Sequence, residues 1–119
     1  MHSHAGRPIL FYAMLENFAE IPSNVIVELG TPLPPLRCRH TSSETIITWR
    51  VNGLSLGQFP GIRSGSVNEN GYRVDTLTIP AEPQYNGTVV ECLAVFLDGS
   101  PTERTPAATI ILLLIGQYG

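Results

Sequence analysis

Apolar and polar residues alternate in short runs along most of this chain after residue 24. Leu36 and Cys38 share one parity, whereas Arg37 and Arg39 share the other. The run TVVECLAVFL, residues 88–97, extends the same period of two over a longer stretch. A period of two is typical of β-strands, in which successive side chains point to opposite faces of a sheet. The apolar spacing of three and four residues that predicts an amphipathic helix does not occur after residue 24.

Turn signals separate these runs about every ten residues. Asn52-Gly53 and Asn70-Gly71 favour tight turns with positive φ. Residues 9–20 contain helix-forming residues and predict a turn or two of helix or a frayed leader, which Pro22 ends. The spacing of the later runs favours an all-β antiparallel sandwich or barrel. We expect a turn-rich segment at 60–71 and strands at residues 24–30, 36–40, 44–51, 54–58, 72–79, 88–97 and 105–115.

The composition indicates one domain and argues against two classes of protein. A chain of 119 residues with 7 basic and 10 acidic residues lacks the positive charge of a nucleic-acid-binding surface. The longest apolar run, residues 107–115, is too short for a transmembrane helix. We therefore expect one domain at 24–115, an N-terminal leader, extension or tag at 1–23, and a C-terminal tail at 116–119. Residues 1–23 do not have the pattern of a secretory signal peptide.

The two cysteines and the tryptophan stand in the order Cys38, Trp49, Cys92, each at an inward position of its expected strand. This constellation resembles the immunoglobulin fold, a two-sheet antiparallel β-sandwich in which cysteines of strands B and F are bonded and a strand C tryptophan packs against them. The resemblance covers residues 24–115. It implies that Cys38 and Cys92 form this disulfide, that Trp49 is the core tryptophan, and that Leu77 is the core residue of strand E.

Two other roles remain open for the cysteines. They would be buried free thiols in a cytosolic relative of the fold, or they would bind a metal. No second pair of cysteines or histidines stands at ligand spacing, so we expect no metal site.

The chain departs from the family pattern at one position. Immunoglobulin domains carry a tyrosine two residues before the second cysteine, whereas this chain has Val90 there. Tyr85 stands close enough in sequence to fill part of the gap. The separation of 54 between the cysteines leaves little room for additional strands, which favours a constant-like or intermediate set over a variable domain.

The sequence contains one candidate modification site but no recognisable set of catalytic residues. Asn86-Gly87-Thr88 is an acceptor for N-glycosylation on an expected loop. No serine has a histidine and an acid at recognisable spacing, and the glycine-rich stretch 61–71 lacks the lysine of a phosphate-binding loop. We expect neither an enzyme nor a cofactor.

Two surfaces are candidates for binding a protein. The outward parity of the expected strand F offers Val89, Leu93 and Val95, on the sheet face that strands G, F and C form in related receptors. This face would form a homodimer or bind another protein, or else the N-terminal segment with Phe11, Met14, Leu15 and Phe18 would fold back over it. The loop between strands F and G supplies Asp98 and Arg104 as the second candidate surface.

The resemblance implies a non-catalytic recognition or adhesion module that is extracellular or secreted. The alternative is a structural module of an intracellular, filament-associated protein, located in the cytoplasm, which needs neither a glycan nor a disulfide. The ligand and the oligomeric state do not follow from the sequence.

Overall fold

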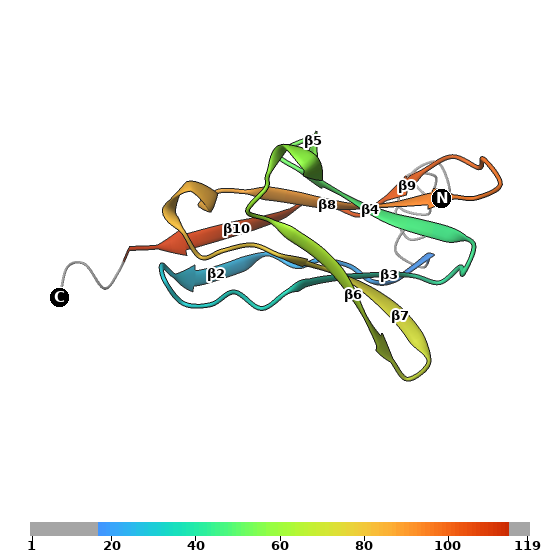
Figure 1. Ribbon diagram of the computed structural model, residues 1–119, viewed down its shortest axis with the longest axis horizontal. Coiled ribbons are helices and arrows are strands. Elements are labelled where there is room, and N and C mark those ends of the chain that lie inside the picture. Colours follow the sequence, from blue (N-terminus) through green and yellow to red (C-terminus); the bar gives the residue numbers. More distant parts are fainter. Residues whose placement is uncertain (1–16, 115–119) are drawn as a thin grey trace, which may run out of the picture.

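The computed structural model describes residues 17–114, which form two packed β-sheets (Figure 1). The first sheet has four strands in the order β1-β3-β7-β6, and the second has the order β2-β10-β8-β4-β5, with β9 paired to β8. All pairs are antiparallel except the parallel pair β2 and β10. The strands are β1 (Phe18–Glu20), β2 (Val25–Glu28), β3 (Leu36–His40), β4 (Thr45–Val51), β5 (Leu54–Ser55), β6 (Arg63–Glu69), β7 (Tyr72–Thr78), β8 (Val89–Phe96), β9 (Glu103–Arg104) and β10 (Ala108–Leu113).

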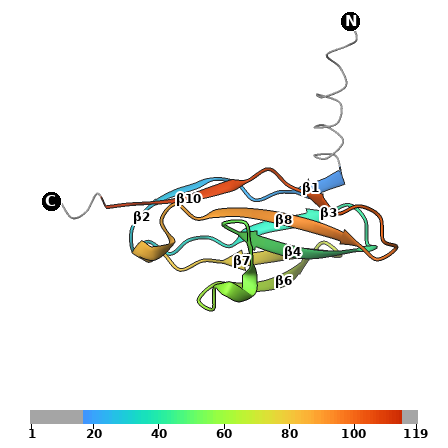
Figure 2. The same cartoon turned by 90° about the horizontal axis from the view of Figure 1, so that it is seen from above.

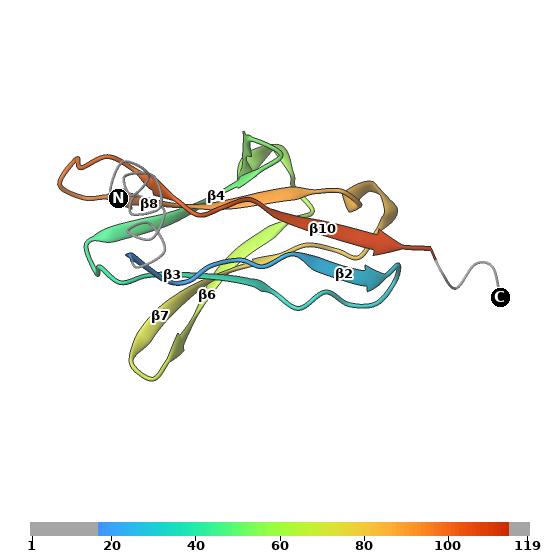
Figure 3. The same ribbon diagram turned by 180° about the vertical axis from the view of Figure 1, so that it is seen from behind.

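The two layers face each other across a single core (Figures 2 and 3). The first two strands lie in different sheets, because the chain crosses from one layer to the other between Glu20 and Val25. Pro22 lies buried in this crossing, where it has no amide hydrogen to offer a sheet. The architecture confirms the predicted two-sheet, all-β sandwich.

Side chains of one parity fill the space between the sheets. Trp49 and Val51 of β4 and Leu77 of β7 are buried together. In β8 the buried inward residues are Val90, Cys92 and Ala94, as the alternation predicts. Apolar burial of this kind is the main favourable term in folding.

Both Asn-Gly turns occur where the sequence places them. Asn52 and Gly53 have φ values of 52° and 77°, and Asn70 and Gly71 have 52° and 83°. Two consecutive residues with positive φ match the right-handed twist of the strands that they join. The turns connect β4 to β5 and β6 to β7.

We predicted a turn-rich segment at 60–71. This prediction is wrong for most of the segment, which contains the strand β6 (Arg63–Glu69). Every residue of β6 is exposed, so neither of its faces needs apolar residues and the alternation is absent. The expected strand at 54–58 is limited to β5, after which the chain forms a short 3₁₀ turn, η2 (Leu56–Gln58). The last expected strand, at 105–115, is shortened to β10, and the unpredicted two-residue strand β9 lies before it, on the other side of Pro106.

The N-terminal boundary of the sandwich also differs from the expected residue 24. Phe18–Glu20 form a strand that pairs with β3, so the helix expected at 9–20 is wrong for these three residues. Phe18 is buried in the core, not spread over an outer face. Phe11, Met14 and Leu15 lie outside the described residues.

Candidate interaction surface

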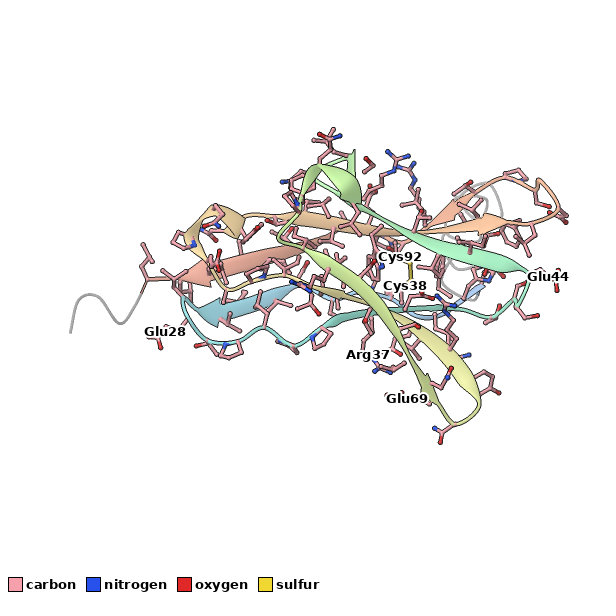
Figure 4. All side chains as sticks on the ribbon, in the orientation of Figure 1. Glu28, Arg37, Cys38, Glu44, Glu69 and Cys92 are labelled. Carbon is pink, nitrogen blue, oxygen red and sulfur yellow. A yellow bond between two sulfur atoms is a disulfide. The ribbon has the colours of Figure 1, made fainter. Side chains whose placement is uncertain are left out.

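The disulfide joins the two sheets at the centre of the core. Cys38 of β3 and Cys92 of β8 are bonded, with their Cα atoms 6.5 Å apart (Figure 4). Trp49 lies directly opposite Cys92 in the pairing of β4 with β8, and it is buried. The predicted disulfide is therefore confirmed, and the structure contains no free cysteine among residues 17–114.

Tyr85 packs against the core from the connection between β7 and β8. It ends the 3₁₀ turn η3 (Pro83–Tyr85), between β7 and β8. Its ring packs against the core, and its hydroxyl group lies against Gly61, before β6. Val90, at the position where the family has tyrosine, is fully buried. The contact with Gly61 joins two connections that are far apart in the sequence.

The predicted partner-binding residues of β8 lie on the outer face of the six-stranded sheet, but they are not equally accessible. Val95 lies opposite Ile46 of β4 in the pairing of the two strands. Ile46, Val95 and Leu97 are 54%, 37% and 62% exposed, and we call this set the Ile46 patch. A cluster of neighbouring exposed apolar side chains is a feature of protein interaction sites.

Leu93 does not contribute to this exposed set. It is only 5% exposed, although its parity is the same as that of Val95. Thr48 and Arg104 flank it in register, and the Arg104 side chain extends along this face to Glu91, at 3.7 Å. Val89, at the start of β8, is half-buried.

The outer face of the four-stranded sheet carries ion pairs. The guanidinium group of Arg37 contacts Glu20 and Glu69, each at 2.6 Å (Figure 4). The hydrogen bonds from Arg37 hold the pKa of Glu69 below its usual value. Arg39 lies 4.3 Å from the centre of the Tyr72 ring, in a cation-π contact. The four-stranded sheet also exposes Val67 and Tyr72, but they lie close to the charged groups of Glu69 and Arg39, whereas the Ile46 patch lies on the face with β4 and β8.

Two polar loops meet at one end of the sandwich, next to the Ile46 patch (Figure 1). The Leu97 amide donates a hydrogen bond to the carbonyl of Glu44, at 3.0 Å, which joins the loop after β8 to the loop before β4. The carboxylate of Asp98 accepts a hydrogen bond from the Ser100 amide at 2.8 Å. Hydrogen bonds from the Ser100 side chain and amide lower the pKa of Asp98. Asp98 and Arg104 are both exposed, as we expected.

A buried histidine supports these loops, and the sequence analysis did not identify it. His40 Nε2 lies 2.8 Å from a carboxylate oxygen of Glu103, and its Nδ1 accepts a hydrogen bond from the Ser42 amide at 2.9 Å. Because Nδ1 accepts, Nε2 carries the proton and donates to Glu103. Asn17 also donates to Glu103, at 3.1 Å. These partners are 63 and 86 residues from Glu103, so no local sequence signal could have paired them.

A groove lies beside His40, but its lining does not form a catalytic set. It has a volume of about 550 Å³ and runs between the β3–β4 connection and β7. Asp75, Arg73, Tyr72 and the serines Ser42 and Ser43 line it. Its one histidine is engaged through both ring nitrogens. Among residues 17–114, no group of three or more acidic, histidine or cysteine side chains is placed to hold a metal ion.

Asn86 has a structural role that is compatible with glycosylation. It is exposed, and its Oδ1 accepts a hydrogen bond from the Leu112 amide at 2.8 Å. A glycan would be attached to the other terminal atom, Nδ2, and would leave this hydrogen bond in place. The Thr88 hydroxyl donates to the Tyr85 carbonyl at 2.6 Å.

Comparisons with known proteins identify similar structures only. No family model matches the sequence, and no curated protein matches it. The N-terminal Ig1-2 module of the Drosophila receptor protein tyrosine phosphatase DLAR is similar, with a TM-score of 0.60 and 20% identity over 80% of this chain and 47% of that one. The tandem Ig repeats of Dlar give a TM-score of 0.60 and 19% identity, over 80% of this chain and 46% of that one.

The chain thus spans less than half the length of these two-domain structures. In the part of the chain described by the structure, no helix is long and apolar enough to cross a membrane. The sheet order, the central disulfide with its tryptophan, and the similar structures agree that residues 17–114 have the immunoglobulin-like fold.

Proposed function

We propose that this chain is a non-catalytic recognition module of the immunoglobulin type, which binds a protein through the Ile46 patch and the two loops beside it. The observation that carries the proposal is the exposure of Ile46 and Val95 on the outer face of β4 and β8, and of Leu97 in the turn directly after β8. Their burial by a partner would remove apolar surface from water, which is the main favourable term in association.

The surroundings of the patch have the composition of an interface rim. Thr48 and Arg104 lie beside it on the same face, and Asp98 lies on the adjoining loop. Protein interfaces commonly combine an apolar centre with a polar, solvent-accessible rim. The hydrogen bonds of Asp98 and Leu97 hold the loop in one conformation, which reduces the entropy lost on binding.

Two observations support an extracellular or secreted setting. Disulfides persist in oxidising compartments and are rare in the cytosol. The similar structures belong to a receptor protein tyrosine phosphatase. The intracellular structural module is the second candidate, and the disulfide between Cys38 and Cys92 disfavours it.

Staining of cells by a multimer tests the proposed surface. The chain, fused to a pentamerising fluorescent carrier, is applied to a panel of animal cell lines. We expect the parent to stain at least one line, and Ile46→Glu or Val95→Glu to reduce binding at least about tenfold, because each places a charge at the centre of the interface. Ile26→Glu is the matched control, since Ile26 is also an exposed isoleucine but lies on β2.

The outcomes separate the surfaces. Loss of staining with Ile26→Glu and not with Ile46→Glu would place the binding surface at β2 and β10. Staining by folded Ile46→Glu and Val95→Glu variants at the parent level would overturn the proposal.

The mass of secreted protein tests the proposed setting. The chain is expressed in mammalian cells behind an added signal sequence, and its intact mass is measured before and after reduction and glycosidase treatment. We expect the mass of a disulfide-bonded protein with a glycan at Asn86, which an Asn86→Gln variant lacks. Efficient secretion with free thiols and an unmodified Asn86 would favour the intracellular module.

A further inference from the structure

The strand β6 has the longest free edge in the described part of the molecule. It is the last strand of the four-stranded sheet and pairs with β7 alone. It contains seven residues, whereas the edge strands β1, β2 and β5 contain three, four and two. All residues of β6 are exposed, and its hairpin with β7 projects from the body of the sandwich (Figure 1).

The turn geometry shows which amides of β6 face outward. In a two-residue hairpin, the residues that flank the turn are a hydrogen-bonded pair, here Glu69 and Tyr72. The hydrogen-bonding direction alternates along an antiparallel strand. Glu69, Val67, Gly65 and Arg63 therefore direct their backbone groups toward β7, and Ser64, Ser66 and Asn68 direct theirs outward.

This edge lacks the features that block edge-to-edge pairing in other proteins. Such edges are protected by proline, by a central charge, by a bulge or by a short length. The residues between Arg63 and Glu69 are Ser, Gly, Ser, Val and Asn, without proline or charge. The pairing of β6 with β7 keeps one register over its whole length, so no bulge twists the edge away.

We propose that two copies of this chain associate through β6, antiparallel and with the two-fold axis at Ser66. In this register Ser66 lies opposite Ser66 of the second copy, and Ser64 lies opposite its Asn68. These are the residues with outward backbone groups, and each such pair exchanges two hydrogen bonds. The interface joins the four-stranded sheets of both copies into one continuous sheet, and it leaves the Ile46 patch of each copy free.

The charges at the ends of β6 select this register. Arg63 of one copy lies opposite Glu69 of the other, on the same face of the sheet, and there it would share the carboxylate that Arg37 already binds through both oxygens; the symmetry forms this arrangement twice. On the same face Val67 lies opposite Gly65 of the second copy, which leaves space for the valine side chain. Centring the axis on Ser64 or Asn68 would leave part of β6 unpaired and would separate Arg63 from Glu69.

The interface is narrow, so the dimer is a weak one. Sedimentation velocity of the chain is measured from about 5 µM to about 1 mM, a range that covers weak association. The parent is expected to convert from monomer to dimer within this range.

Ser66→Pro removes the outward amide at the two-fold axis. The pairing with β7 does not use this amide, and proline is tolerated on edge strands at such positions. We expect self-association to weaken at least about tenfold, because the central pair loses both of its hydrogen bonds. Ser66→Thr is the matched control, since it keeps the amide and is expected to dimerise like the parent.

Arg63→Glu gives a second test that does not depend on the backbone. It places two glutamates opposite each other at both ends of the interface, and we expect about tenfold weaker association that recovers partly at high salt. Arg63→Lys is its control. Arg63 forms no ion pair within residues 17–114, so neither substitution removes one from the monomer. Circular dichroism and the unfolding midpoint verify that the variants are folded.

Three results would overturn the proposal. The first is a parent that stays monomeric to about 1 mM, where even weak specific interfaces are populated. The second is self-association of folded Ser66→Pro and Arg63→Glu at the parent affinity. The third is a dimer that Ile46→Glu disrupts and Ser66→Pro does not, which would assign self-association to the outer face of β4 and β8.

Discussion

Replacing Gly61 by alanine is expected to destabilise the protein, because Tyr85 occupies the space that the new methyl group needs. A Cβ atom at Gly61 would lie within 3.0 Å of the Tyr85 hydroxyl oxygen, closer than real Cβ atoms approach other atoms. The next atom, Cζ of the same ring, would be at 3.5 Å, an ordinary contact distance. Forced overpacking of this kind costs about 1–3 kcal/mol. The backbone is not an obstacle, since Gly61 is not among the residues with positive φ.

Tyr85→Phe isolates the contact, because it removes only the hydroxyl group. In the Tyr85→Phe background the methyl group of Gly61→Ala meets Cζ alone. The destabilisation caused by Gly61→Ala should then fall to near zero. The lower entropy of the unfolded alanine chain, worth about 0.4–1 kcal/mol, can then make the substitution slightly stabilising.

Urea unfolding of the parent, both single variants and the double variant measures this coupling. A loss of about 2 kcal/mol would lower the midpoint by about 1 M, for a slope of about 2 kcal/mol/M. We expect a coupling free energy above about 1 kcal/mol between the two sites. The proposed contact would be refuted if Gly61→Ala lowered the free energy of unfolding equally in the tyrosine and phenylalanine backgrounds. It would also be refuted if Gly61→Ala lowered it in neither background.

Three further perturbations test other parts of the structure. Reduction of the disulfide opens a covalent loop with a sequence separation of 54, and it should lower the free energy of unfolding by about 4 kcal/mol. Thermal melting with and without reductant measures this loss, and an unchanged melting temperature would contradict the stabilising role of the bond. The buried Cys92 amide donates a hydrogen bond to the Thr105 hydroxyl at 3.1 Å, and Thr105→Val removes this acceptor. The free energy of unfolding in urea should fall by about 1–3 kcal/mol. Thr105→Ser keeps the hydroxyl group and should lower the free energy of unfolding by less. Arg37 lowers the pKa of Glu69, so this carboxylate stabilises the folded state above its unfolded pKa, near 4.5, and the stabilisation is lost as the pH falls through the lower folded value. The melting temperatures of the parent and Glu69→Gln should therefore differ at pH 7 and converge as the pH falls below 4.5 through the lower folded pKa, and a constant difference would contradict this linkage.

The sequence predicted the strands with one buried face better than those without. The alternation of β3 and β8 is visible because the core requires apolar residues at every second position. The strand β6 has no buried residue, so it has no such pattern, and its composition resembles a loop. The strand β1 is too short for a period to appear, and its pairing with β3 supplies the stability that its local sequence lacks.

For the candidate interaction surface, too, the sequence predicted some features and not others. Parity placed Val95 and Leu93 on the outer face, but exposure depends on neighbouring strands. Leu93 is flanked by Thr48 and Arg104, which lie 45 residues before and 11 residues after it in the sequence. The support of the loops by His40 and Glu103 likewise depends on residues 63 apart.

The sequence by itself determined the class of fold, the parity of the core strands, both Asn-Gly turns, and the two cysteines and tryptophan at the centre of the sandwich. These features are local, since they follow from the period of side chains along a strand and from the φ angles that asparagine and glycine allow. The tertiary structure decided which outward residues are accessible, which polar groups pair, and which strand has a free edge. Those properties depend on what lies beside each residue after the sheets have formed, and distances between remote segments are set only when the whole chain packs.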